Sequence, residues 1–170
     1  MKTIKEKMIY NLDEFISKWN HVSSDPYKVI MLYLLAALNI EKNLDEAENM
    51  MTVIVSKKDC LEDNESPTGL MLGRSAGYFL RRFQDNPNIA RSYLGGSPEN
   101  NYQVNESNLE LTVLREEEIN ERLKIFIKSK GKDFLTPVQV QKNRDNEWKL
   151  VEYSSICTGV KKPLSEQNDF

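Results

Sequence analysis

The segment Gly95-Gly96-Ser97-Pro98-Glu99-Asn100-Asn101-Tyr102 divides the sequence into two halves of different character. Before it, apolar residues recur at helical spacing. After it, they alternate or form short blocks that are typical of strands. The two glycines permit positive φ, the proline fixes its own φ, and the asparagines tolerate left-handed backbone. We therefore predict that this junction loop (residues 95–102) connects a helical layer to a sheet.

The half before the junction loop predicts about four helices. Asp25-Pro26 is a clear helix start, with an acid at the N-cap and proline at the first helical position. The helix that follows is apolar on nearly all sides, so we expect it to be the central buried helix. Residues 57–67 are polar and predict a loop. The predicted helices cover residues 11–19, 26–39, 44–55 and 66–83, with a further short turn in residues 89–94.

The half after the junction loop predicts four strands. Apolar and polar residues alternate in each strand, and Asn143-Arg144-Asp145-Asn146 is a good hairpin turn before the last one. Residues 115–118 are charged and predict a solvated turn. The predicted strands cover residues 109–113, 123–128, 138–141 and 148–154. Helices first and strands second predict an α+β fold, with the N-terminal helices packed on one face of a four-stranded antiparallel sheet.

Composition is that of an ordinary globular chain. It has 170 residues, of which 39% are hydrophobic and 29% charged, so we predict a single domain over residues 1–170. Residues 1–90 form its helical layer, 91–160 the loop and sheet, and 161–170 a flexible tail. The N-terminus lacks a secretory apolar core, and the longest apolar run has ten residues, about half of a membrane span. With two cysteines only, we predict a cytoplasmic protein with reduced thiols.

The motifs predict neither catalytic residues nor a cofactor. Residues 69–75 resemble a phosphate-binding loop, but one residue is missing between the glycines and arginine replaces lysine. His21 is the only histidine, and neither Cys60 nor Cys157 lies in a recognisable nucleophile context. The acids of residues 116–118 lack the spacing and the glycine bend of a calcium loop. We therefore predict no metal site either.

Two surfaces are candidates for binding. Glu99, Asn100 and Asn101 lie on a constrained loop, where functional side chains often occur, but their amides also suit bonds to the loop's own backbone. The outer face of the predicted sheet carries lysines and glutamines, which would suit an acidic protein or a nucleic acid. Phe126 is the only aromatic residue on that face, so nucleic acid is the weaker interpretation. The residues that define this face are Lys124, Lys128, Lys130, Gln139, Gln141 and Lys149.

The C-terminal half resembles a bacterial family of unknown function, found largely in Firmicutes. The resemblance rests on Ser92-Tyr93-Leu94 with the junction loop, Phe126-Ile127-Lys128-Ser129-Lys130-Gly131, Trp148-Lys149-Leu150-Val151-Glu152-Tyr153-Ser154-Ser155 and Gly159-Val160-Lys161-Lys162-Pro163. It covers residues 90–163 strongly and the helical half by general character. The sequence departs from the family pattern at Leu135-Thr136-Pro137, where a Pro-Arg-Pro-like segment is expected. The resemblance implies a shared fold and no activity.

Two functions follow as hypotheses. The first is a non-enzymatic interaction module that binds another protein through the junction loop or the lysine-bearing sheet face. The alternative is a small-ligand-binding or enzymatic fold with a pocket between sheet and helices, lined by Glu99, Tyr102, Trp148 and Tyr153. Nucleic-acid binding would require an affinity that falls steeply with salt.

Overall fold

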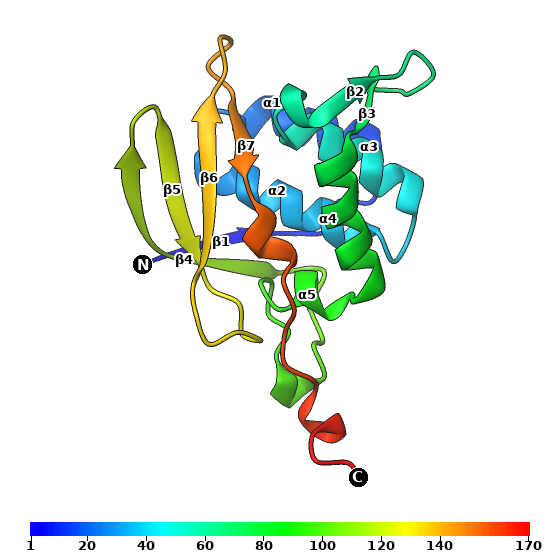
Figure 1. Ribbon diagram of the computed structural model, residues 1–170, viewed down its shortest axis with the longest axis vertical. Coiled ribbons are helices and arrows are strands. Elements are labelled where there is room, and N and C mark those ends of the chain that lie inside the picture. The colour runs from blue at the N-terminus through cyan, green and yellow to red at the C-terminus, as the bar shows by residue number, and fades with distance from the viewer.

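The helices precede four of the five strands of the main sheet in the computed structural model, which describes residues 1–170 (Figure 1). The helices are α1 (Leu12–Val22), α2 (Pro26–Asn39), α3 (Leu44–Ile54), α4 (Arg74–Asp85) and α5 (Asn88–Arg91). The strands are β1 (Lys2–Glu6), β2 (Cys60–Glu62), β3 (Leu70–Leu72), β4 (Leu109–Ile119), β5 (Arg122–Ile127), β6 (Thr136–Lys142) and β7 (Trp148–Glu152). Four 3-10 helices connect them, namely η1 (Lys57–Asp59), η2 (Pro98–Asn100), η3 (Ser154–Cys157) and η4 (Leu164–Glu166).

The main sheet has five strands in the order β1-β4-β5-β6-β7, and all its neighbouring pairs are antiparallel. The predicted α+β class is confirmed, but the prediction of four strands is wrong. The first residues of the chain add an edge strand, in which Lys2 lies opposite Val113 and Ile4 opposite Leu111. This strand carries three charged residues and one large apolar residue. Its alternation is therefore too weak to read from the sequence, although charged edge strands are common.

Strand β4 is longer than predicted, because it continues through the three glutamates assigned to a solvated turn. The register shifts between Val113 and Arg115, and Glu116, Glu117 and Glu118 then pair with β5. All three side chains are exposed. Backbone pairing across the hairpin holds this end of the strand, so it needs no apolar residues there.

A small hairpin replaces part of the predicted loop and of the fourth helix. Strands β2 and β3 pair with Cys60 opposite Leu72, and the polar turn between them is closed by side chains such as Asp63, which accepts a hydrogen bond from the amide of Glu65. The apolar residues 70–72 therefore belong to a strand, and α4 begins only at Arg74.

Helix α2 is the centre of the helical layer, as its sequence predicts. Asp25 caps it by accepting hydrogen bonds from the amides of Tyr27 and Lys28, and residues 29–39 are all buried. The helix packs against β1 and β7 on one side, whereas α1 and α3 pack against α2 itself. The picture of four helices lying directly on the sheet is thus too simple. Because α2 is apolar all round, it contacts the sheet and the other helices at once.

The two faces of the sheet differ in burial. The inner face contributes residues such as Leu111, Ile125 and Val138 to one core of 41 buried residues drawn from both halves of the chain. On the outer face Phe126 is covered by the guanidinium group of Arg115, 3.7 Å from the ring centre, and Lys124 lies 3.9 Å from Glu117. None of the helices combines the length and apolar character that crossing a lipid bilayer requires.

Candidate functional site

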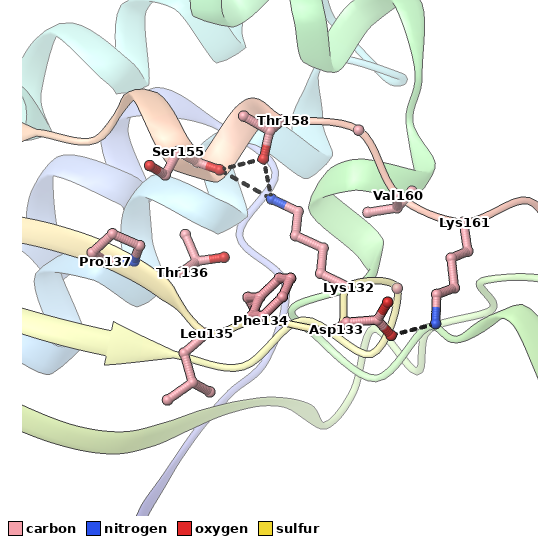
Figure 2. Close-up of a pocket in the computed structure, with 12 residues that line it drawn as sticks. Lys132, Asp133, Phe134, Leu135, Thr136, Pro137, Ser155, Thr158, Val160 and Lys161 are labelled. Carbon is pink, nitrogen blue, oxygen red and sulfur yellow. Dashed lines mark hydrogen bonds and ion pairs between the residues drawn. The ribbon is translucent and has the colours of Figure 1, made fainter.

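A cavity of about 530 Å³ opens at the start of β6, between the β5–β6 connection (residues 128–135) and the chain that follows η3. Residues 131–137 line one side, and Ser155 with residues 158–161 lines the other. Figure 2 shows the side chains that meet there. The cavity joins two segments that are separated in sequence, so its shape depends on how they are held together.

Lys132 holds the two sides together. Its ammonium group donates to the Thr158 hydroxyl at 2.7 Å and to the Ser155 carbonyl at 3.0 Å (Figure 2). It also donates to the Tyr93 hydroxyl at 2.6 Å, with the Ile156 carbonyl at 3.4 Å. An ammonium group has three protons, so every one has an acceptor. The group has no carboxylate partner within 4 Å, and burial lowers its pKa to about 8. Lys132 therefore acts as a structural link rather than as a free cation.

Tyr93 and Thr136 complete this polar cluster beneath the cavity. The Tyr93 hydroxyl donates to the Ile156 carbonyl at 2.9 Å and lies 3.1 Å from the Thr136 hydroxyl. Burial raises the pKa of Tyr93, so the phenol remains neutral at ordinary pH. The cluster has an acceptor for each donor, which fixes the start of β6 against η3.

The junction loop also contacts the segments that line the cavity. The Tyr102 hydroxyl donates to the Lys161 carbonyl at 2.5 Å, and the amide of Lys161 in turn donates to the carbonyl of Gly131 at 3.0 Å. A Cβ atom on Gly131 would lie 2.6 Å from the Tyr102 hydroxyl, so only glycine fits there. The amide of Lys130 donates to the Ser92 carbonyl at 2.9 Å. The first part of the connection is thus tied to Ser92 directly and to Tyr102 of the junction loop through Lys161.

Residues 7–164 match the family model described as Domain of unknown function (DUF6935). The chain belongs to this family. Membership of a family of unknown function, which the sequence predicts, is confirmed, and the match also takes in the helical half, from α1 onward. No curated protein and no solved structure matches the chain.

The predicted residues of the junction loop have different surroundings. The Asn100 side chain accepts hydrogen bonds from the amides of Ser97 and Gln103 and donates to the carbonyl of Gly95. Asn101 has a left-handed backbone, and its side chain accepts a hydrogen bond from Ser165 in the predicted tail. Glu99 is exposed. The sequence leaves two interpretations of this loop open, a binding surface or side chains bonded to the loop's own backbone. Asn100 fits the second interpretation, whereas the side chain of Glu99 is available to a partner.

The aromatic residues proposed to line a pocket lie apart from the junction loop or are buried. Tyr102 is fully buried. Tyr153 is 3% exposed, and its hydroxyl donates to Asp59 at 2.8 Å. Trp148 is half-buried beside the β6–β7 turn, with the Lys142 ammonium 5.3 Å from its ring. A pocket lined by these residues therefore receives no support from their positions, and that function stays a prediction.

Phe134 is a candidate site residue that is absent from the sequence predictions. Its side chain is 86% exposed at the rim of the cavity, and Leu135 beside it is 36% exposed. The signal was available, because this phenylalanine follows Gly131, Lys132 and Asp133 in a polar connection, where no helical or strand periodicity explains an aromatic residue. Burial raises the pKa of the Cys60 thiol to about 11 and also raises that of Cys157, which disfavours either as a nucleophile.

Proposed function

We propose that this protein is a non-enzymatic interaction module that binds an acidic protein partner through the β5–β6 connection. The observation that carries the proposal is the exposed ring of Phe134 on a connection whose backbone is tied down on both sides. Exposed aromatic side chains often anchor protein interfaces, and an anchor on a backbone that is already held on both sides loses less backbone entropy on binding.

The charge around Phe134 supports an acidic partner. Lys128 and Lys130 precede it on the same connection, both are exposed, and neither lies within 4 Å of a carboxylate. Lys161 is neutralised by Asp133 at 2.5 Å, but Lys162 beside it has no such partner. Positive charge at the rim of an interface steers an acidic partner and adds specificity. Lys128 and Lys130, which the sequence predicts on the sheet face, lie instead on the connection after β5 and act here beside an aromatic anchor.

The junction loop has a supporting role in this proposal. Tyr102 holds the connection through the Lys161 carbonyl, and Asn100 holds the junction loop itself. The side chain of Glu99 is exposed and remains available to a partner. We include a cytoplasmic location in the proposal, which the two free thiols support.

Photo-crosslinking tests the proposal. A photoreactive phenylalanine analogue at position 134 is expected to capture one acidic protein in cells, whereas the same analogue at Leu61, which is 57% exposed on the β2–β3 hairpin, is expected not to capture it. With that partner purified, Phe134→Ser should weaken binding about tenfold or more, because an anchor side chain dominates such interfaces. Leu61→Ser is the matched control and should bind as the wild type does.

The melting temperature separates loss of binding from loss of fold. The Phe134 ring is mostly in solvent, so Phe134→Ser should melt with the wild type. Equal capture from positions 134 and 61, or unchanged affinity of Phe134→Ser, would refute the proposed surface.

A further inference from the structure

A second hollow, of about 510 Å³, lies at the other end of β6. We call it the hairpin groove. Its walls are Ser56 with η1, Arg122 at the start of β5, and the β6–β7 hairpin from Gln141 to Asp145 together with Lys149 and Val151. Figure 1 shows the β6–β7 turn at one end of the molecule and the β5–β6 connection toward the other. The hairpin groove is therefore separate from the surface proposed above.

The hairpin groove concentrates positive charge. Six of its lining side chains are cationic and two are acidic. None of the six cations lies within 4 Å of a carboxylate, although seven ion pairs form elsewhere in the chain. The cationic residues are Lys57, Lys58, Arg122, Lys142, Arg144 and Lys149.

The two acids are outnumbered by the six cations, so the groove keeps a net positive charge. Asp59 accepts a hydrogen bond from the buried Tyr153 hydroxyl at 2.8 Å, so one of its oxygens is already engaged. Asp145 lies in the exposed hairpin turn, where its amide donates to the side chain of Asn143. Like charges that line one hollow repel one another, and cations without carboxylate partners gain stability when an anion enters.

The fold holds the walls of the groove in place. Val55 forms a parallel bridge with Leu150, and the amide of Ser56 donates to the Leu150 carbonyl at 2.9 Å, which fastens η1 to β7. Arg122 lies opposite Gln141 in the β5–β6 ladder. At the hairpin turn, the amide of Asn143 donates to the Glu147 carbonyl. Three segments distant in sequence thus present their cations to one hollow.

Lys149 extends the positive charge toward the protein interior. Its ammonium donates to the Val53 carbonyl at 2.6 Å and lies 4.8 Å from the centre of the Trp19 ring. Burial lowers the pKa of this lysine. Arg122 uses one guanidinium nitrogen on the Gln139 side chain at 3.1 Å, which leaves its other N–H groups for a ligand.

We propose that the hairpin groove binds a small ligand that carries two or more phosphate groups. Its volume falls within the range of small-molecule sites, about 300–1,000 Å³. Guanidinium groups suit phosphate oxygens because they donate in pairs, and ammonium groups add point charges around them. A single anionic group would leave most of the six cations unpaired, so a polyphosphate matches the groove better than a monoanion.

A long nucleic acid fits the surroundings poorly. The positive surface ends at β5, because the neighbouring strand β4 exposes Glu116, Glu117 and Glu118, and Glu121 directly precedes Arg122. A phosphodiester chain that continued past the groove would meet these carboxylates. The charge is therefore confined to an area that suits a compact ligand.

Titration calorimetry with inorganic tripolyphosphate as the probe tests this proposal. The wild type should bind tripolyphosphate about tenfold or more tightly than inorganic phosphate, and the double variant Lys57→Gln/Lys58→Gln should lose about tenfold or more. Both lysines are exposed, so the variant should keep the wild-type melting temperature. Arg144→Gln, on the opposite wall, should weaken binding in the same direction.

The matched control is Lys128→Gln/Lys130→Gln, which removes the same charge from two exposed lysines outside the groove. Its affinity for tripolyphosphate should stay within about twofold of the wild type. Equal losses in both double variants would show a general charge effect and overturn the site. Tighter binding of a short single-stranded DNA than of tripolyphosphate would overturn the ligand class. Absence of any binding at low salt would overturn both.

Discussion

The two ends of β6 use positive charge in opposite ways. At its start, the ammonium of Lys132 meets four oxygen acceptors and joins the β5–β6 connection to η3. At its end, six cations surround the hairpin groove and none has a carboxylate partner. The strand has seven residues, so about 20 Å separates the two ends. Within that distance, a lysine serves the fold at one end, whereas exposed lysines such as Lys57 and Lys58 remain available to a ligand at the other.

This difference shows that the acceptors around a cation decide its role. A lysine whose three protons are bonded inside the protein has nothing left for a partner, and its removal leaves buried acceptors unpaired. A lysine without acceptors contributes repulsion to the fold and attraction to an anion. The comparison therefore makes opposite predictions for stability at the two ends.

The largest loss of stability is expected in the junction loop, which supports the start of β6. A Cβ atom on Gly96 would lie 2.9 Å from the Arg91 carbonyl oxygen and from two backbone atoms of Tyr102. Backbone atoms cannot move aside cheaply, so Gly96→Ala should lower the free energy of unfolding by about 2–3 kcal/mol. Urea unfolding measures this. Gly159→Ala is the control, because no heavy atom lies within 4 Å of its Cβ position, and a similar loss there would show that the effect is not specific.

A smaller loss is expected for Lys132→Met, which keeps most of the aliphatic side chain and removes the ammonium. The Tyr93 hydroxyl and the Ser155 carbonyl lose a donor, and water from the open cavity replaces it in part. The free energy of unfolding should fall by about 1–2 kcal/mol. Lys58→Met, in the hairpin groove, should change it by no more than about 0.5 kcal/mol. If the two variants lose equal stability, the contrast between the ends of β6 is wrong.

The pH dependence of the free energy of unfolding tests whether the ammonium of Lys132 is buried as described. Burial lowers the pKa of Lys132 to about 8, below the value of about 10.4 for an unfolded lysine. Between these values the unfolded chain holds a proton that the folded chain has lost, so the free energy of unfolding rises with pH.

The difference between wild type and Lys132→Met in urea unfolding should therefore grow as pH increases from about 8 to about 10 and stay constant below about 7. The subtraction removes the titration of groups that both proteins share. A difference that is flat across the whole range would mean that Lys132 keeps its ordinary pKa in the folded state.

The elements that the sequence predicts well are those with strong local signals. The Asp25-Pro26 start and the apolar run after it identify α2, and the turn before β7 is where its asparagines place it. The missed elements depend on partners distant in sequence. β1 becomes a strand only because β4 pairs with it, and residues 70–72 become one because β2 does. Tertiary pairing decides such short segments.

The candidate sites are likewise hard to predict from the sequence, because they depend on contacts between segments distant in sequence. Phe134 could be noticed as an aromatic residue in a polar connection, but its exposure depends on how η3 and the junction loop hold that connection. The cations of the hairpin groove come from η1, β5 and the β6–β7 hairpin, and no sequence spacing relates them. Asn100 could be read either way, and only its hydrogen bonds assign it to the loop backbone.

The position of β1 has a consequence for how the chain reaches its final form during translation. Lys2 pairs with Val113 and Glu6 with Leu109, so β1 leaves the ribosome more than a hundred residues before its partner strand does. The helices between them can form and pack in the meantime, since their contacts are local. We therefore expect the N-terminal strand to dock late, and a bulky fusion at the N-terminus to slow that closing step more than one at the C-terminus.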